Sequence, residues 1–219
     1  MSFSTLAQES DFSLYLITDR HQTGGKPLAD VVRQALDGGV KAVQLREKDL
    51  SGAELYRLAV EMRQLTAEYD ARLIINDRAD IALAVGADGI HIGVNSMPVA
   101  AARCLMGRDK VIGYSAHVID EALRAQEDGA DFITFSPVYV TASKAAYGEP
   151  CGVRKLADTA SALKIPVIAL GGISQNNIRE VLSAPIQGIA VISAILAAAD
   201  PCVAAASLLK KIEEYAQHS

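Results

Sequence analysis

Few cysteines and a deficit of basic residues exclude several classes of protein. The 219 residues include only three cysteines, Cys104, Cys151 and Cys202, which lie far apart and form no C-x-x-C motif. This pattern predicts neither a disulfide framework nor a zinc site and favours a reducing cytoplasm. The 21 Lys and Arg are outnumbered by 26 Asp and Glu, which gives a formal charge of −5. Because an acidic surface repels phosphate backbones, we do not expect a nucleic acid as the main partner.

Long apolar runs and several well-known catalytic motifs are also missing. No run of about 18 apolar residues occurs, so no membrane span is predicted. The stretch before Arg20 has no basic residue, which is unlike a signal peptide. The chain has no G-x-S-x-G, P-loop, H-E-x-x-H or G-x-G-x-x-G motif. A dinucleotide site is therefore not indicated. Half of the residues are hydrophobic, which is enough to bury a core and excludes disorder.

Short apolar runs alternate with amphipathic helical segments along the chain. The predicted strands are residues 14–18, 40–45, 72–75, 89–92, 110–114, 132–135, 166–170 and 188–192. The predicted helices are residues 28–36, 51–68, 98–106, 118–128, 152–163, 174–183 and 201–215, with a short helix ending at residue 85. The segment Gly86–Ile92 has a close repeat at Gly129–Phe135, in which a helix again ends at Gly before a buried strand.

Strands that are apolar on both faces belong to a parallel sheet covered by helices. Eight strand–helix units in about 200 to 250 residues are typical of a (β/α)8 TIM barrel with its active site at the C-terminal ends of the strands. A doubly wound open sheet is the alternative, which we consider less favoured because no clear edge strand is present. No linker divides the chain, so we predict one TIM-barrel domain over residues 1–219, with residues 1–12 as an N-terminal extension.

Polar residues follow directly on the second and third predicted strands. Alternation places Gln44, Arg46 and Lys48 on one side of the chain, where two cations at a barrel mouth would suit an anion such as diphosphate. A surface ion-pair cluster with neighbouring acidic residues is an equally favoured interpretation. The third strand ends in Asn76 and Asp77, whose oxygen atoms suit Mg²⁺. The alternative is that one of them only caps the next helix.

The fourth and fifth strands bring two histidines near the same face. His91 lies within the fourth strand and is either a lumen residue or a hydrogen-bonded core histidine. Ser115 and His117 alternate at the end of the fifth strand, so both can face a site. His117 is a candidate general base, with a place near the N-cap of the next helix as the alternative.

Two loops suggest binding of phosphorylated ligands. The long segment from Ser136 to Pro150 contains Thr141, Ser143 and Lys144, whose hydroxyls and ammonium suit such a ligand, although an ordinary solvated loop is about equally favoured. After the last two strands come Gly171-Gly172 and Ile192-Ser193. In barrels these loops often bind phosphate through backbone N–H groups, and Ser193 would add a cap at a short helix. A plain structural turn at the two glycines is the alternative.

Taken together, these motifs resemble the thiamin phosphate synthase and TenI-like thiazole tautomerase superfamily. The resemblance covers nearly the whole chain and rests on ordered matches at Leu14–Arg20, Gln44–Lys48, Ile75–Arg78, Gly86–Gly93, Ser115–His117, Thr141–Lys144, Gly171–Ile173 and Ile192–Ile195. Its synthase branch implies an enzyme of thiamin biosynthesis. Such an enzyme couples hydroxymethylpyrimidine diphosphate to thiazole phosphate, releases diphosphate and uses Mg²⁺.

The resemblance also implies roles for individual residues. Those that would hold the diphosphate are Arg46, Lys48, Asn76 and Lys144, with Asp77 as the Mg²⁺ ligand. Those that would line the pyrimidine are Gln44 and Ser115, and those that would bind the thiazole phosphate are Thr141, Gly172, Ile192 and Ser193.

One departure from the synthase pattern leaves both the synthase and the tautomerase branch open. The pattern Gly-Gln-x-Asp after the fourth strand is here Gly93-Val94-Asn95-Ser96, so Ser96 replaces the second Mg²⁺-binding carboxylate. The retained Lys48 and Asp77 favour the synthase. Ser96 favours the tautomerase branch, which needs no metal and would use His117 to move a proton.

A protein that only binds thiazole or thiamin phosphate, and a different barrel enzyme acting on another small phosphate, are further alternatives. The partners expected are small phosphorylated substrates, without nucleic acid or membrane. The oligomeric state is not readable from the sequence, which leaves a homo-oligomer open.

Overall fold

A computed structural model describes residues 12–140 and 149–217, and in it eight parallel strands form a closed barrel. The strands are β1 Leu14–Ile17, β2 Ala42–Leu45, β3 Arg72–Asn76, β4 Gly89–Gly93, β5 Val111–Ala116, β6 Phe132–Phe135, β7 Val167–Leu170 and β8 Gly188–Val191. They follow one another in chain order around the ring, and β8 pairs in parallel with β1. This closure confirms the predicted (β/α)8 barrel and excludes a doubly wound open sheet.

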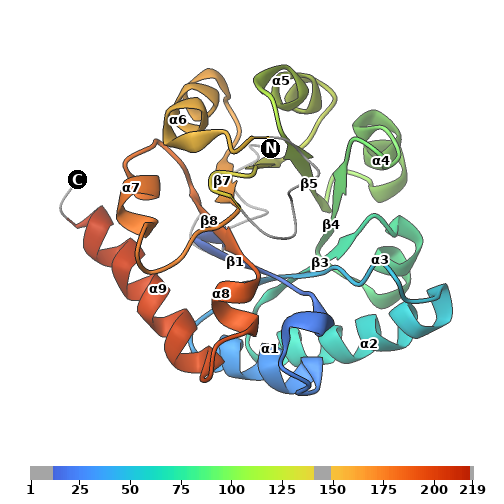
Figure 1. Cartoon of the computed structure of the whole chain (residues 1–219). Helices are drawn as coiled ribbons and strands as arrows, with labels where there is room; N and C mark the ends of the chain where they lie inside the picture. Colours follow the sequence, from blue (N-terminus) through green and yellow to red (C-terminus); the bar gives the residue numbers. More distant parts are fainter. Residues whose placement is uncertain (1–11, 141–148, 218–219) are drawn as a thin grey trace.

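Helices surround the barrel, as the view along its axis shows (Figure 1). They are α1 Leu28–Asp37, α2 Gly52–Glu68, α3 Ala79–Val85, α4 Val99–Met106, α5 Ile119–Glu127, α6 Gly152–Ala162, α7 Ile178–Leu182, α8 Ser193–Leu196 and α9 Pro201–Ala216, with a short 3-10 helix η3 at Arg20–Gln22. The C-terminal α9 packs beside α1, α7 and α8. Within residues 12–140 and 149–217, none of the helices combines the length and the apolar character that a bilayer crossing needs.

Local sequence signals account for some helix ends. Ser51 and Glu54 form the capping box that starts α2, because the side chain of each residue bonds the backbone N–H of the other. The helix predicted over 174–183 instead begins at Ile178. The side-chain oxygen of Asn177 accepts the backbone N–H of Ser174 at 2.8 Å, a local bond that competes with helix formation.

Two apolar layers follow from the alternation of side chains along the strands. One layer lies between the strands and the helices, and the other fills the barrel lumen. The lumen layer consists of Phe12, Tyr15, Ile17, Ala42, Ile74, Val111, Phe132, Ile168, Leu170 and Ala190. Phe12, predicted to belong to the N-terminal extension, is buried here with its ring 4.9 Å from that of Phe132. The rest of that extension lies outside the described residues.

Candidate active site at the C-terminal ends of the strands

Polar side chains replace apolar ones in the lumen toward the C-terminal ends of β2 to β6. Gln44, Asn76, His91, Ser115 and Thr134 occupy alternate positions that point inward with the lumen layer. The strand register brings Asn76 level with His91, and Ser115 level with Thr134. The predicted clustering of Gln44, Asn76 and Ser115 at one end of the barrel is therefore present.

Gln44 is held by a buried tyrosine. Its side-chain nitrogen donates to the hydroxyl of Tyr15 at 3.0 Å, and both residues are buried. Burial raises the pKa of Tyr15 well above its ordinary value, because the phenolate would lose its hydration, while the hydrogen bond from Gln44 offsets part of that rise. The tyrosine therefore stays neutral and fixes the carboxamide of Gln44 in the lumen.

His91, Ser115 and Thr134 form a compact polar cluster. The Nε2 atom of His91 lies 2.9 Å from Ser115 Oγ and 3.2 Å from Thr134 Oγ1, and the two hydroxyl oxygens are 3.2 Å apart. Both alternatives for His91 thus hold together, since it is a lumen residue and is hydrogen-bonded. Gly113 makes room for it, because a Cβ there would lie 2.5 Å from Nδ1 of His91. Thr134 was not predicted as a site residue, although the alternation Phe132-Ile133-Thr134 places it inward.

Asp77 receives hydrogen bonds from two side chains at the end of β3. Asn76 donates its Nδ2 to Asp77 Oδ2 at 2.8 Å, and the hydroxyl of Ser96 donates to Asp77 Oδ1. Helix α3 has Arg78 as its N-cap, with no side-chain capping bond, so neither Asn76 nor Asp77 acts as a cap. Asp77 has a φ of 60°, a left-handed conformation that Asp tolerates better than most residues.

The local donor set is a carboxylate, a carboxamide and a hydroxyl, all able to offer oxygen to a hard cation. No group of three or more His, Cys, Asp or Glu suited to holding a metal occurs in the part of the chain that the structure describes. Any Mg²⁺ here would thus rely on Asp77 as its one carboxylate, with water and substrate phosphate completing its shell.

The acidic residues around Arg46 and Lys48 are engaged elsewhere. Glu47 pairs with Arg20 at 3.1 Å, and Asp49 pairs with Arg20 at 2.6 Å and with His21 at 3.1 Å. Among the described residues, no ion pair involves Arg46 or Lys48. The predicted pairing of Arg46 and Lys48 with Glu47 and Asp49 is therefore not found among the described residues, because these carboxylates bond Arg20 and His21 instead.

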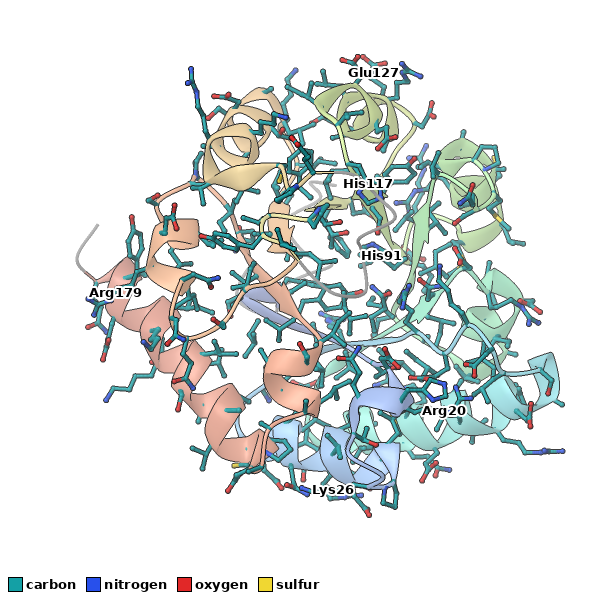
Figure 2. All side chains as sticks on the ribbon, in the orientation of Figure 1. Arg20, Lys26, His91, His117, Glu127 and Arg179 are labelled. Carbon is teal, nitrogen blue, oxygen red and sulfur yellow. The ribbon has the colours of Figure 1, made fainter. Side chains whose placement is uncertain are left out.

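A cavity of about 340 Å³ lies between the loops after β1 and β2, and its lining includes Arg46, Lys48, Asp19 and Asp49. Hydrogen bonds from Arg20 and then His21 lower the pKa of Asp49, which keeps this carboxylate charged. Figure 2 shows Arg20 on the side of the barrel where α1 and α2 lie.

His117 is fixed by two neighbours. Its Nδ1 lies 2.7 Å from the backbone oxygen of Ser136, and its backbone N–H donates to Glu121 at 2.8 Å. A carbonyl oxygen can only accept, so Nδ1 carries a proton and Nε2 is the basic nitrogen of the neutral ring. The N-cap of α5 is Val118. Figure 2 shows both His117 and His91 on the inner side of the ring of helices.

The two glycines after β7 are required by packing. Gly171 and Gly172 have φ values of 108° and 67°, and a Cβ on either would come within 2.8 Å of Pro137 or Tyr139 in the loop after β6. Both glycines therefore have a structural reason to be glycine, and this leaves the predicted binding of phosphate by their N–H groups open. No hydrogen bond among residues 12–140 and 149–217 uses the N–H of Gly172 or Ser193.

The prediction that Ser193 caps the short helix α8 was wrong. Ile192 is the N-cap residue, its side chain makes no capping bond, and Ser193 is the first helical residue. Ile192 has no side-chain oxygen, and its carbonyl accepts the N–H of Ile195, so in the described part of the chain the N–H groups of Ser193 and Ala194 are the ones with no acceptor. The remaining predicted site residues, Thr141, Ser143 and Lys144, lie outside the described residues.

Comparisons with known proteins give the same picture from sequence and from fold. A family model described as "Thiamine monophosphate synthase" matches residues 14–195. A Geobacter sulfurreducens protein named as a candidate thiamine-phosphate synthase is 58% identical over 199 residues, which cover 91% of this chain and 93% of that protein. "Thiamine-phosphate synthase" of Desulfitobacterium hafniense strain Y51 is 44% identical, with coverage of 91% and 96%.

A solved structure agrees with these sequence matches. Thiamine phosphate pyrophosphorylase from Pyrococcus furiosus superposes with a TM-score of 0.88 and 40% identity, covering 95% of this chain and 99% of that one. The family match extends from β1 into α8 and so includes every strand of the barrel and the described site residues. The chain belongs to the thiamine monophosphate synthase family.

Proposed function

We propose that this protein is a thiamine-phosphate synthase that couples hydroxymethylpyrimidine diphosphate to thiazole phosphate and releases diphosphate. The observation that carries the proposal is the arrangement at the ends of β2 and β3. Two cations without an ion-pair partner among the described residues, Arg46 and Lys48, follow β2, and the carboxylate of Asp77 follows the neighbouring β3. Cations together with a metal-binding carboxylate suit a diphosphate leaving group better than a plain phosphate.

Diphosphate departure is the step that these residues would assist. The bond between the pyrimidine methylene carbon and the diphosphate oxygen breaks, and both electrons leave with the oxygen. Arg46 and Lys48 then stabilise negative charge where it develops. Lys144, outside the described residues, is proposed to add a further cation from the loop after β6.

Mg²⁺ is proposed to bind Asp77 with the substrate diphosphate and water. The oxygen donors at Asp77 and Ser96 fit this ion, which often binds through one or two carboxylates plus substrate phosphates. When bound, Mg²⁺ supplies charge neutralisation of the leaving diphosphate. Asn76 keeps the carboxylate of Asp77 oriented through its 2.8 Å hydrogen bond.

Binding of the two rings would complete the reaction. Gln44 and Ser115 offer a carboxamide and a hydroxyl to the polar edge of the pyrimidine, and each is held by a buried neighbour, Tyr15 and His91. The thiazole nitrogen attacks the methylene cation with its lone pair and forms the new carbon–nitrogen bond. Holding both substrates in one lumen lowers the entropic barrier to this attack.

The thiazole phosphate is proposed to bind at the ends of β7 and β8. The N–H groups of Gly172 and Ser193 are candidates to receive it, together with the backbone at Ile192 and with Thr141 and Ser143. The small phosphorylated partners follow from the family. A cytoplasmic site of action and the absence of a nucleic-acid partner remain proposals based on cysteine usage and the acidic charge.

A thiazole tautomerase is the second candidate function, and one observation favours it. Ser96 provides a hydroxyl in place of a second carboxylate, which suits a reaction that needs no metal, and the Nδ1 contact with Ser136 fixes the ring orientation of His117 at this end of the barrel. The relatives reported above carry synthase names, which favours the synthase.

One assay separates the two candidates. The purified protein is mixed with hydroxymethylpyrimidine diphosphate, thiazole phosphate and Mg²⁺, and thiamin phosphate and diphosphate are quantified. We expect both products in a one-to-one ratio. No product would overturn the synthase proposal, and isomerisation of a thiazole carboxylate phosphate that is lost in His117→Ala would then establish the tautomerase.

A further inference from the structure

Glu47 is a buried carboxylate that lies between the two candidate diphosphate-binding cations in the sequence and bonds the segment after β1. Its side chain is 1% exposed. Its Oε1 accepts a hydrogen bond from the hydroxyl of Thr18 at 2.7 Å and one from the backbone N–H of Arg20 at 3.2 Å. Its Oε2 accepts the same N–H at 3.1 Å and the Arg20 guanidinium at 3.1 Å. All four bonds come from the segment that follows β1.

Such an arrangement calls for a physical reason. Burying a carboxylate costs several kcal/mol unless hydrogen bonds and an opposite charge compensate it. Here both are present, because Arg20 supplies the opposite charge and Thr18 supplies a further donor. An apolar residue could fill the same space without this requirement. The use of a buried ion pair instead of an apolar contact therefore suggests that this loop needs a defined geometry.

The hydroxyl of Thr18 extends that geometry to Arg46. While it donates to Glu47, it also accepts the backbone N–H of Arg46 at 2.9 Å. Thr18 is fully buried, and its own N–H donates to the backbone oxygen of Gln44 at 2.9 Å. The backbone that carries Arg46 is thus bound to the end of β1 on both sides of the residue, through Gln44 and through Glu47.

Arg20 holds the other end of the same loop. Its guanidinium makes two parallel bonds of 2.6 Å to the carboxylate of Asp49, directly after Lys48. These bonds, with the carboxylates of Glu47 and Asp49, raise the pKa of Arg20. Side-chain bonds to Arg20 therefore flank Lys48, at Glu47 before it and at Asp49 after it.

We propose that Glu47 is a positioning residue for the diphosphate subsite. Together with Thr18 and Arg20 it forms a clamp that fixes the loop backbone, so that Arg46 and Lys48 meet the diphosphate without reordering. Glu47 is buried against the segment after β1 through its bonds to Thr18 and Arg20, and it lies directly between Arg46 and Lys48 in the chain. Cations that are already in place stabilise developing charge without a reorganisation cost. This inference rests on the proposed function.

Two variants and two controls test the clamp. Glu47→Gln keeps the shape but turns an amide toward Arg20, and Thr18→Val removes the bridging hydroxyl at constant volume. Thr18→Ser keeps that hydroxyl and serves as the rescue variant. Glu68→Gln removes an exposed ion pair with Arg33 far from the site and is the matched control. Each full-length protein is titrated calorimetrically with inorganic diphosphate at fixed Mg²⁺, and separately with thiazole phosphate.

The clamp predicts a selective loss. The dissociation constant for diphosphate should rise about tenfold or more in Glu47→Gln and Thr18→Val, because small displacements of charged groups cost that much. It should stay unchanged in Thr18→Ser and Glu68→Gln, and thiazole phosphate affinity should hold in all four. Unchanged diphosphate affinity in Glu47→Gln, or an equal loss of both ligands, would overturn the positioning role.

Failure of the clamp is distinguishable from failure of the proposed function. The proposed function fails if the wild-type protein forms no thiamin phosphate, whatever the variants do. The clamp fails if the wild-type protein is a synthase that binds diphosphate while Glu47→Gln binds it equally well. Should Glu47→Gln not fold, Thr18→Val against Thr18→Ser decides the question alone.

Discussion

The hydroxyl of Ser96, in the loop after β4, donates a hydrogen bond to the carboxylate of Asp77 at the end of β3. The same hydroxyl oxygen accepts the backbone N–H of Gly93 at 2.8 Å, which ties the loop to its own strand. A neutral group thus stands beside Asp77 where the synthase pattern has a carboxylate. A Mg²⁺ ion bound at Asp77 would thus meet one carboxylate where the synthase pattern has two, and the diphosphate would supply more of the ligand charge.

Changing Ser96→Asp should strengthen the response to Mg²⁺. A second carboxylate beside Asp77 adds a ligand for the ion, so the half-saturating Mg²⁺ concentration should fall about tenfold. Without Mg²⁺ the two carboxylates repel each other, so the melting temperature in EDTA should drop and then recover on addition of Mg²⁺. Turnover against Mg²⁺ concentration and thermal unfolding with and without the ion measure both effects.

Ser96→Ala is the control for this change, because it removes the hydrogen bond to Asp77 without adding charge. It should raise the half-saturating Mg²⁺ concentration. A Ser96→Asp protein with the wild-type Mg²⁺ response would show that residue 96 does not face the ion.

Two substitutions of Asp77 separate the effect of its charge on Mg²⁺ binding from the effect of its left-handed backbone on stability. Asn tolerates a left-handed φ about as well as Asp, so Asp77→Asn should keep the melting temperature within about 2–4 °C of wild type while removing the Mg²⁺ response. Ala tolerates a φ of 60° less well, so Asp77→Ala should lose a further 1 kcal/mol or so of stability. Urea unfolding and Mg²⁺-dependent turnover report the two effects. A strong Mg²⁺ response in both variants would exclude Asp77 as the ligand.

Sequence patterns were sufficient for the barrel because closure depends on features that alternate regularly. All eight strands lie where apolar runs predicted them, and the inward positions of Gln44 and Ser115 follow from a period of two. The start of α2 at Ser51 was readable from its capping-box pattern, whereas other helix starts were less predictable. The helix α7 starts late because the side chain of Asn177 accepts the backbone N–H of Ser174. At the end of β8, Ile192 is the N-cap of α8, and Ser193 is already the first helical residue.

The supporting residues of the site were not predictable because their partners are distant in the sequence. Glu47 is bonded to Thr18, 29 positions earlier, and Gln44 is bonded to Tyr15 at the same separation. In the sequence alone, Glu47 is one of four consecutive charged residues and has no feature that marks it as buried. Only the structure shows that its carboxylate bonds Thr18 and Arg20 after β1.

Gly172→Ala should damage both stability and binding of thiazole phosphate. The φ of 67° strains an Ala by about 1–2 kcal/mol, and its Cβ would come within 2.8 Å of Tyr139 Cβ, which adds about 1–3 kcal/mol. Since the displaced backbone carries the N–H proposed to bind phosphate, the dissociation constant for thiazole phosphate should also rise. Unfolding curves and calorimetric titration measure these changes.

Gly86→Ala is the matched control, because Gly86 has a φ of 66° and nothing within 4 Å of its added Cβ. It should lose only the conformational part, about 1–2 kcal/mol, and should bind thiazole phosphate normally. Equal thiazole phosphate affinity in both variants would remove Gly172 from the phosphate site.

Because the hydroxyl of Tyr15 is buried, we expect the free energy of unfolding to fall at alkaline pH. Its pKa is raised in the folded protein, mainly by burial, from an ordinary value of 10.0. The stability linked to the protonated hydroxyl is therefore fully present below about pH 10 and is lost as the pH rises above it, by about 1.4 kcal/mol per pH unit. Tyr15→Phe removes this dependence but also removes the acceptor for Gln44, which costs about 1–2 kcal/mol at neutral pH.

The two proteins should therefore differ most at pH 8 and converge as the pH rises through 10 to 11, as measured by urea unfolding at each pH. Tyr139, whose pKa burial and Glu180 raise to about 12, titrates in both proteins and cancels in the difference. A gap that stayed constant from pH 8 to 11 would mean that the unfolded and folded states ionise Tyr15 alike. The hydroxyl would then be hydrated in the folded protein, and Tyr15 would no longer explain how Gln44 is held in the lumen.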